Sequence, residues 1–169
     1  MTENILKNKF FLKSLLIAFI VAVLDLLSKR VIFAILENIA VRDMVEYPQI
    51  EILPFFNIVY VWNRGVSFGM FNNIENAQLL LSILQFSVAL IISIWMYRNK
   101  NSFFVLPLGL IVGGALGNVV DRVRNGAVAD FLDFHIANYH WPAFNIADSC
   151  VFIGVALIVF YDIFLKKVK

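Results

Sequence analysis

Four apolar segments, each long enough to cross a bilayer, are the feature that most limits what this chain can fold into. They lie at about 11–36, 78–97, 103–120 and 147–165. The chain is 61% hydrophobic and 15% charged, whereas a soluble domain is about 45–50% apolar and about 25% charged. We therefore predict one integral membrane domain over residues 1–169, a mainly α protein whose core is a bundle of four transmembrane helices.

The first apolar segment carries charges in its second half. Three lysines within residues 1–13 precede its apolar run from Ser14 to Leu24, as in a signal peptide, but no small-residue cleavage pattern follows, so we expect it to stay uncleaved. Asp25 and Lys29 are four residues apart, which places them on one helix face where they can pair. A lone charge at this depth costs roughly 2.5–3.5 kcal/mol. Two roles remain open: an ion pair that orients the helix, or a direct part in a functional site.

A polar region at about 40–74 separates the first two spans. Segments 50–56 and 58–62 are short and rich in β-branched and aromatic residues, which favours strands. Asn63, Arg64 and Gly65 predict a turn, followed by a third short strand up to Phe71. We expect a small antiparallel sheet lying on the membrane, because its aromatic residues suit the interface. The sheet could be a plain connection or a platform that holds substrate against the bilayer.

The second and third spans carry few polar residues. Gln85 is the only strongly polar residue deep in the second span. In the third, Gly109, Gly113 and Gly117 recur every fourth residue, a spacing that lets a neighbouring helix approach closely. Asn118 lies on an adjacent face, which must meet protein, water or substrate rather than lipid.

Residues 123–146 leave the membrane before the last span begins. We predict a short interfacial helix from Val128 to Ala137, with Phe131 and Phe134 on its apolar side. Asn145 is placed to cap the last helix, with Asp148 at its third position, near the positive end of the helix dipole. Capping is therefore a structural alternative to a functional role for these two residues.

Basic residues predict the orientation. The lysines before the first span, Arg98 and Lys100 between the second and third, and the lysines after the fourth all fall on one side. By the positive-inside rule both termini are cytoplasmic, and Asp130 and Asp148 lie with the sheet on the outer side.

Two nearby carboxylates cannot both ionise cheaply, so one keeps a proton while the other loses it. This arrangement can activate water and protonate a leaving group. Asp130 and Asp148 are the best pair, because each borders a membrane-proximal element. Cys150 has no evident histidine partner and predicts packing, and two histidines five residues apart give little support for zinc.

Five motifs together resemble those of the lipoprotein signal peptidases (signal peptidase II), bacterial membrane aspartic proteases. They are Asp25–Lys29 (DLLSK), Asn63–Phe68 (NRGVSF), Gly113–Arg122 (GGALGNVVDR), Val128–Phe131 (VADF) and Phe144–Asp148 (FNIAD). Each motif alone is weak, but their order and spacing cover nearly the whole chain. Ser67 replaces the more usual alanine and Ala129 a more usual valine.

The resemblance implies that Asp130 and Asp148 are the catalytic dyad. It also implies that the site is lined or supported by Asn63, Gly114, Asn118, Asp121, Arg122 and Asn145, with Asp25 and Lys29 in the first motif. The implied substrate is a prolipoprotein cleaved just before its diacylglyceryl-modified cysteine, with no metal or cofactor. We expect a monomer of the bacterial cytoplasmic membrane, with membrane lipids as partners and no nucleic acid.

Two other classes of protein share part of this pattern. An ion-coupled transporter or channel subunit also places Asp, Asn and Gly in membrane helices, but usually at the bilayer midplane in broken helices. A structural subunit or assembly factor would not need paired Asn-x-x-Asp motifs.

Overall fold

The computed structural model describes residues 2–65 and 77–166, and it contains the four predicted helices and a small sheet. The helices are α1 (Thr2–Asp43), α2 (Ala77–Arg98), α3 (Val105–Asn125) and α4 (Ile146–Phe160). A 3₁₀ turn, η2 (Ser102–Phe104), precedes α3, and a π-helical turn, η3 (Tyr161–Leu165), continues α4. Within the described ranges four helical segments are long and apolar enough to cross a membrane, which confirms the predicted class of fold.

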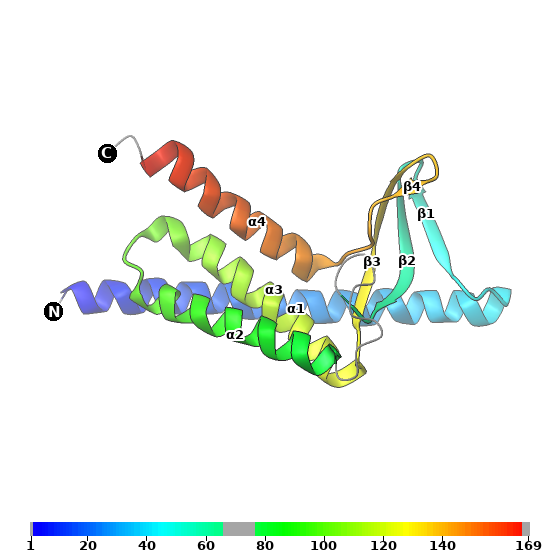
Figure 1. Cartoon of the computed structure of the whole chain (residues 1–169), viewed down its shortest axis with the longest axis horizontal. Coiled ribbons are helices and arrows are strands. Elements are labelled where there is room, and N and C mark those ends of the chain that lie inside the picture. Colours follow the sequence, from blue (N-terminus) through cyan, green and yellow to red (C-terminus); the bar gives the residue numbers. More distant parts are fainter. Residues whose placement is uncertain (1, 66–76, 167–169) are drawn as a thin grey trace.

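Helix α1 is longer than the predicted first span. It ends at Asp43 rather than near residue 36, so the first residues assigned to the outer platform are helical. At about 1.5 Å per residue, such a helix is roughly twice as long as the hydrocarbon core is thick. It therefore runs along the whole molecule, from the end that carries both termini to the end that carries the sheet (Figure 1).

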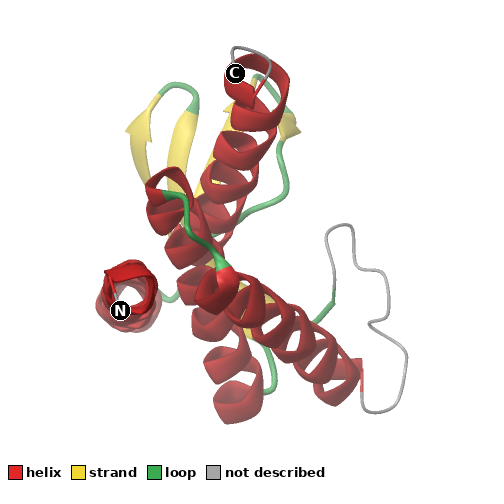
Figure 2. Cartoon of the chain, turned by 90° about the vertical axis from the view of Figure 1, so that its left-hand side faces the viewer, coloured by secondary structure: helices red, strands yellow, loops and turns green. Residues whose placement is uncertain are grey.

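Helix α3 is the centre of the bundle and packs against α1, α2 and α4. Its glycine stripe allows the predicted close approach of a neighbouring helix, and that helix is α1. A Cβ atom on Gly113 would lie 2.5 Å from the carbonyl oxygen of Ala18, and one on Gly117 would lie 2.5 Å from Oδ2 of Asp25. Only glycine permits this approach. On the other side of α3, helices α2 and α4 diverge from each other (Figure 2).

Four antiparallel strands stand at one end of the helices, in the order β1-β2-β3-β4 (Figure 1). Strands β1 (Gln49–Leu53) and β2 (Phe56–Asn63) are the two predicted strands. The other two, β3 (Val128–Ile136) and β4 (Tyr139–His140), come from the segment between α3 and α4. The third predicted strand, up to Phe71, lies outside the described residues.

The predicted interfacial helix at 128–137 is wrong, because this segment is strand β3. Phe131 and Phe134 are three residues apart, a spacing that suits one helix face. In the strand they point to opposite faces instead: Phe131 is buried against Phe33 of α1, and Phe134 is 42% exposed. Strand β2 offers an edge whose backbone groups pair with this segment from Phe56 to Asn63, and that pairing outweighs the local helical pattern.

Candidate active site

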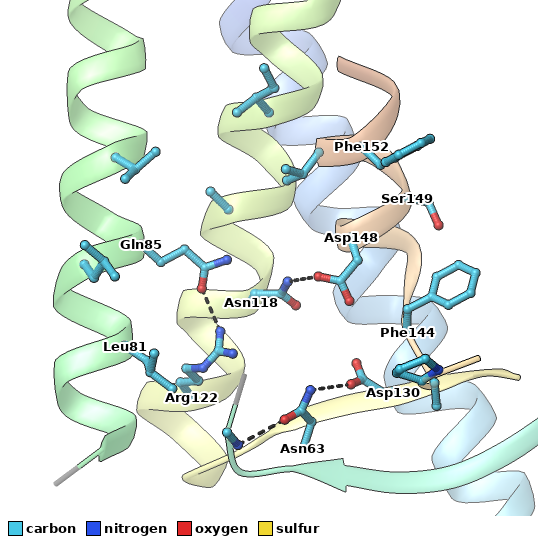
Figure 3. Close-up of a pocket in the computed structure, with 18 of the residues that line it drawn as sticks. Asn63, Leu81, Gln85, Asn118, Arg122, Asp130, Phe144, Asp148, Ser149 and Phe152 are labelled. Atoms are coloured by element: carbon cyan, nitrogen blue, oxygen red, sulfur yellow. Dashed lines mark hydrogen bonds between the residues drawn. The ribbon is translucent and has the colours of Figure 1, made fainter. Parts of the chain in front are cut away.

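Asp130 and Asp148 reach one pocket from two different elements. Asp130 lies on β3, paired with Val61 of β2, and Asp148 lies in the first turn of α4. Both side chains line a pocket of about 860 Å³ that is bounded by α2, α3, α4 and the sheet (Figure 3). The structure thus brings together the two carboxylates that sequence alone selected.

Each carboxylate accepts a hydrogen bond from an asparagine amide. Nδ2 of Asn145 donates to Oδ1 of Asp130 at 2.7 Å, and Nδ2 of Asn118 donates to Oδ1 of Asp148 at 2.8 Å. The two amides also meet, because Nδ2 of Asn145 lies 3.2 Å from Oδ1 of Asn118. A continuous chain of hydrogen bonds therefore joins the two acids and fixes their side chains.

The predicted cap of α4 is present. Oδ1 of Asn145 accepts the backbone N–H of Asp148 at 2.9 Å, and Oδ2 of Asp148 accepts the backbone N–H of Asn145 at 3.3 Å. This is a capping box. Capping and a place in the site are not alternatives here, since the cap uses the oxygen of Asn145 and leaves its amide nitrogen for Asp130.

Asn63 adds a second donor to Asp130. Its Nδ2 lies 2.9 Å from Oδ2 of Asp130, and its own Oδ1 accepts the backbone N–H of Gly65 at 3.0 Å. The end of β2 therefore holds one oxygen of the carboxylate, and Asn145 holds the other.

Burial sets the protonation of Asp130, whose side chain is almost entirely removed from solvent. Desolvation, with a smaller contribution from the charge of Asp148, raises the pKa of Asp130 to about 7. The amide donors of Asn63 and Asn145 oppose this shift. Near neutral pH this carboxyl can therefore hold or release a proton.

A buried charge cluster lies behind the pocket. Nζ of Lys29 lies 2.7 Å from Oδ2 of Asp25 and 3.0 Å from Oδ2 of Asp121, and donates to Oδ1 of Asn118 at 2.9 Å. The predicted pair of Asp25 and Lys29 is therefore present. None of the three charged residues is among those that line the pocket, and Lys29 reaches it through Asn118.

The same cluster ties together the elements that carry the two acids. Oδ1 of Asp25 accepts the backbone N–H of Ala147 at 2.9 Å, and Oδ2 of Asp121 accepts that of Ala129 at 3.2 Å. Ala147 precedes Asp148 and Ala129 precedes Asp130. The cluster thus fixes the backbone immediately before each acid.

The two remaining predicted residues, Gly114 and Arg122, have different surroundings. Gly114 supports the site by packing, because a Cβ atom there would lie 2.4 Å from the carbonyl oxygen of Ala147. Arg122 lines the pocket and donates through one terminal nitrogen to Oε1 of Gln85 at 2.6 Å (Figure 3).

Sequence reasoning left several pocket residues without a role. Gln85 stood out as a polar residue deep in an apolar span, a signal that could have placed it at the site. The segment 141–144 and Ser149 also line the pocket, although no signal beyond closeness to Asp148 marked them. The rest of the wall is mostly apolar, with Leu81, Leu84 and Val88 of α2 facing Ile111 and Ala115 of α3 and Val151 and Phe152 of α4.

Four helices that can span a membrane, with two carboxylates in a pocket between α2, α3, α4 and the sheet, define the class as a membrane enzyme. The family model for signal peptidase (SPase) II matches residues 17–164. A lipoprotein signal peptidase of Sulfurihydrogenibium sp. (strain YO3AOP1) is 40% identical over 166 residues, which are 95% of this chain and 96% of the relative. The corresponding protein of Alteromonas mediterranea is 45% identical over 122 residues, 70% of this chain and 67% of the relative.

A solved bacterial membrane enzyme, determined by the in meso method at 1.9 Å, has a TM-score of 0.72 and 30% identity, and the match covers 89% of this chain and 92% of that one. The chain belongs to the signal peptidase II family, as its motifs predict, and is a protease. This assignment replaces the transporter and assembly-factor interpretations.

Proposed function

We propose that this protein removes the signal peptide from diacylglyceryl-modified prolipoproteins, cutting just before the lipid-modified cysteine. The family assignment and the name that its relatives carry support this substrate class. The observation that carries the proposal is the placement of Asp130 and Asp148 at the polar end of an otherwise apolar pocket. Such a wall suits a precursor whose signal peptide and lipid are apolar, while the acids meet its peptide bond.

In the proposed reaction, Asp148 is the general base and Asp130 the general acid. Asp148 lies near the N-terminus of α4 and accepts two N–H donors, which favour its ionised form. It takes a proton from a water molecule as the water oxygen attacks the scissile carbonyl carbon. Asp130, which holds a proton up to a pH of about 7, gives that proton to the departing amide nitrogen. The peptide bond breaks, and proton exchange between the acids and solvent restores the starting state.

The surroundings of the dyad take supporting roles in this proposal. Asn63, Asn118 and Asn145 hold the carboxylates, and Arg122 contacts substrate. The buried cluster of Asp25, Lys29 and Asp121, together with Gly114, keeps the supporting backbone in place. We further propose that the chain acts as a single domain and a monomer in the bacterial cytoplasmic membrane, with lipids around its helices, both termini cytoplasmic and the dyad near the outer face.

The experiment that tests this function uses the purified protein in detergent with two forms of one precursor. We expect cleavage of the diacylglyceryl-modified form and little cleavage of the unmodified form, with lipid-modified cysteine as the first residue of the product. Mass spectrometry of the two fragments locates the cut. Cleavage elsewhere, or equal cleavage of both forms, would contradict the proposed specificity.

A further inference from the structure

Gln85 makes a contact that nothing in the function proposed so far explains. It is the one strongly polar side chain deep in α2, and it is half-buried. Its Oε1 accepts a hydrogen bond of 2.6 Å from a terminal nitrogen of Arg122 in α3 (Figure 3). A short bond between a guanidinium and a neutral acceptor is a strong restraint in an apolar setting. The bond therefore fixes the position of the Arg122 side chain against α2.

Without that restraint, the positive charge of Arg122 would be attracted to the carboxylates around it. The carboxylates of Asp148, Asp130 and Asp121 all act on its charge. Asp121 is already paired with Lys29. Among the described residues, Arg122 nevertheless forms no ion pair within 4.0 Å, and its Nε is buried without a hydrogen-bond partner. A guanidinium that was free to move would form a bidentate ion pair with a carboxylate, the partner that its geometry matches best.

We propose that Gln85 is a positioning residue that holds the guanidinium of Arg122 away from Asp130 and Asp148. The acids then stay free to exchange protons, and the remaining N–H groups of Arg122 stay available for a carbonyl oxygen of the bound precursor. This inference rests on the proposed function, since it assigns Gln85 a part in that same reaction. Gln85 itself need not touch the substrate.

Two measurable effects follow from losing the acceptor. First, the precursor loses a preorganised donor, so KM rises. Second, Arg122 moves toward the acids, and a cation beside a carboxyl favours its ionised form. The acid of the pair then loses its proton at lower pH. The alkaline decline of the cleavage rate therefore begins at lower pH. The charged groups that take part are Lys29 of α1, Asp121 and Arg122 of α3, Asp130 of β3 and Asp148 of α4.

The test compares Gln85→Leu, which removes the acceptor, with Gln85→Glu, which keeps one at the same place. The matched control is Ser87→Ala on the same helix, because Ser87 is exposed and bonds only to the carbonyl of Ile83 among the described residues. For Gln85→Leu we expect KM for the lipid-modified precursor to rise roughly tenfold. We also expect the alkaline limb of the pH profile to shift to lower pH by about one unit. Ser87→Ala should keep the wild-type KM within about twofold, and Gln85→Glu, which restores an acceptor for Arg122, should have a KM closer to wild type than that of Gln85→Leu.

The Arg122→Leu background separates positioning from a structural role. There, adding Gln85→Leu should change KM by less than about twofold and should leave the alkaline limb of the pH profile where it was, since the restrained group is gone. The proposal is wrong if Gln85→Leu leaves both readouts unchanged, or if it acts equally with and without Arg122. A wild-type protein that fails to cleave the lipid-modified precursor would instead contradict the proposed function, so the two failures are distinguishable.

Discussion

Asn145 shows how a single side chain can serve both the fold and the site. It is fully buried, its oxygen caps α4, and its amide nitrogen bonds to Asp130 and Asn118. An Asn-x-x-Asp pattern can therefore mark a helix start and lie in a candidate active site at once. The two roles use different atoms, which allows them to be separated by substitution.

Asn145→Ser keeps a capping oxygen and removes the amide donor. Serine is nearly as good an N-cap as asparagine, so the free energy of unfolding should fall by only about 1 kcal/mol. The rate of precursor cleavage should fall far more, by about 10²-fold, because Asp130 loses its 2.7 Å donor. Thermal unfolding in detergent and kcat measure the two effects. An Asn145→Ser protein that cleaves at close to the wild-type rate would show that the amide has no separate role.

The pH profile should reflect the state of Asp130. Its raised pKa, about 7, means that the neutral form persists up to neutral pH and is lost above it. If Asp130 is the acid of the pair, cleavage should decline as pH rises through about 7, and should decline again at acidic pH where Asp148 gains a proton. The two apparent values belong to the coupled pair. Initial rates across pH 4 to 10 measure the profile, and a rate that stays flat from pH 6 to 10 would exclude Asp130 as the acid.

Contacts within one element were predictable from sequence, whereas contacts between elements were not. The pairing of Asp25 with Lys29 follows from their spacing along one helix. The second carboxylate on Lys29, that of Asp121, lies in another helix. The bond from Arg122 to Gln85 also crosses between helices. Helical periodicity says which face a residue occupies but not which neighbour covers that face.

At the scale of elements, β3 is the segment whose secondary structure the local sequence pattern did not predict. Its sequence, VADFLDFHI, does not alternate regularly between apolar and polar residues, and the spacing of Phe131 and Phe134 suits a helix. Backbone pairing with β2, which lies far away in the sequence, determines that this segment is a strand. The four spans were predictable because a long apolar run is itself sufficient evidence for a membrane helix.

The glycine stripe on α3 provides a test of the helix packing. Gly117→Ala would place a Cβ atom 2.5 Å from Oδ2 of Asp25, so α1 or the buried ion pair must shift. Overpacking of this kind lowers the free energy of unfolding by about 1–3 kcal/mol. The control is Gly126→Asn, because Gly126 has φ 67, which asparagine tolerates, and open space around it. Thermal unfolding in detergent compares the two; a Gly117→Ala protein as stable as wild type would contradict the packing.

At the scale of the whole molecule, both chain ends and the connection from α2 to α3 lie at the end opposite the sheet (Figure 1). The basic residues beside them predict that this end is cytoplasmic. A reporter fused at Asn99 should therefore read as internal and one at Asn138, in the turn between β3 and β4, as external. Reversed signals from these two sites would invert the proposed orientation and place the dyad at the inner face.

The measurement that tests the account most directly is the cleavage rate of the Asp148→Asn protein on a lipid-modified precursor. Asparagine keeps the size of the side chain and an oxygen for the capping box, so the variant should fold and insert. It cannot take a proton from water, and loss of general acid–base catalysis predicts a rate at least about 10²-fold below wild type.

The control is Asp162→Asn, an exposed carboxylate beyond the far end of α4 that pairs with Lys166, which should cleave at the wild-type rate. A folded Asp148→Asn protein that cleaves as fast as this control would contradict the assignment of Asp130 and Asp148 as the catalytic pair.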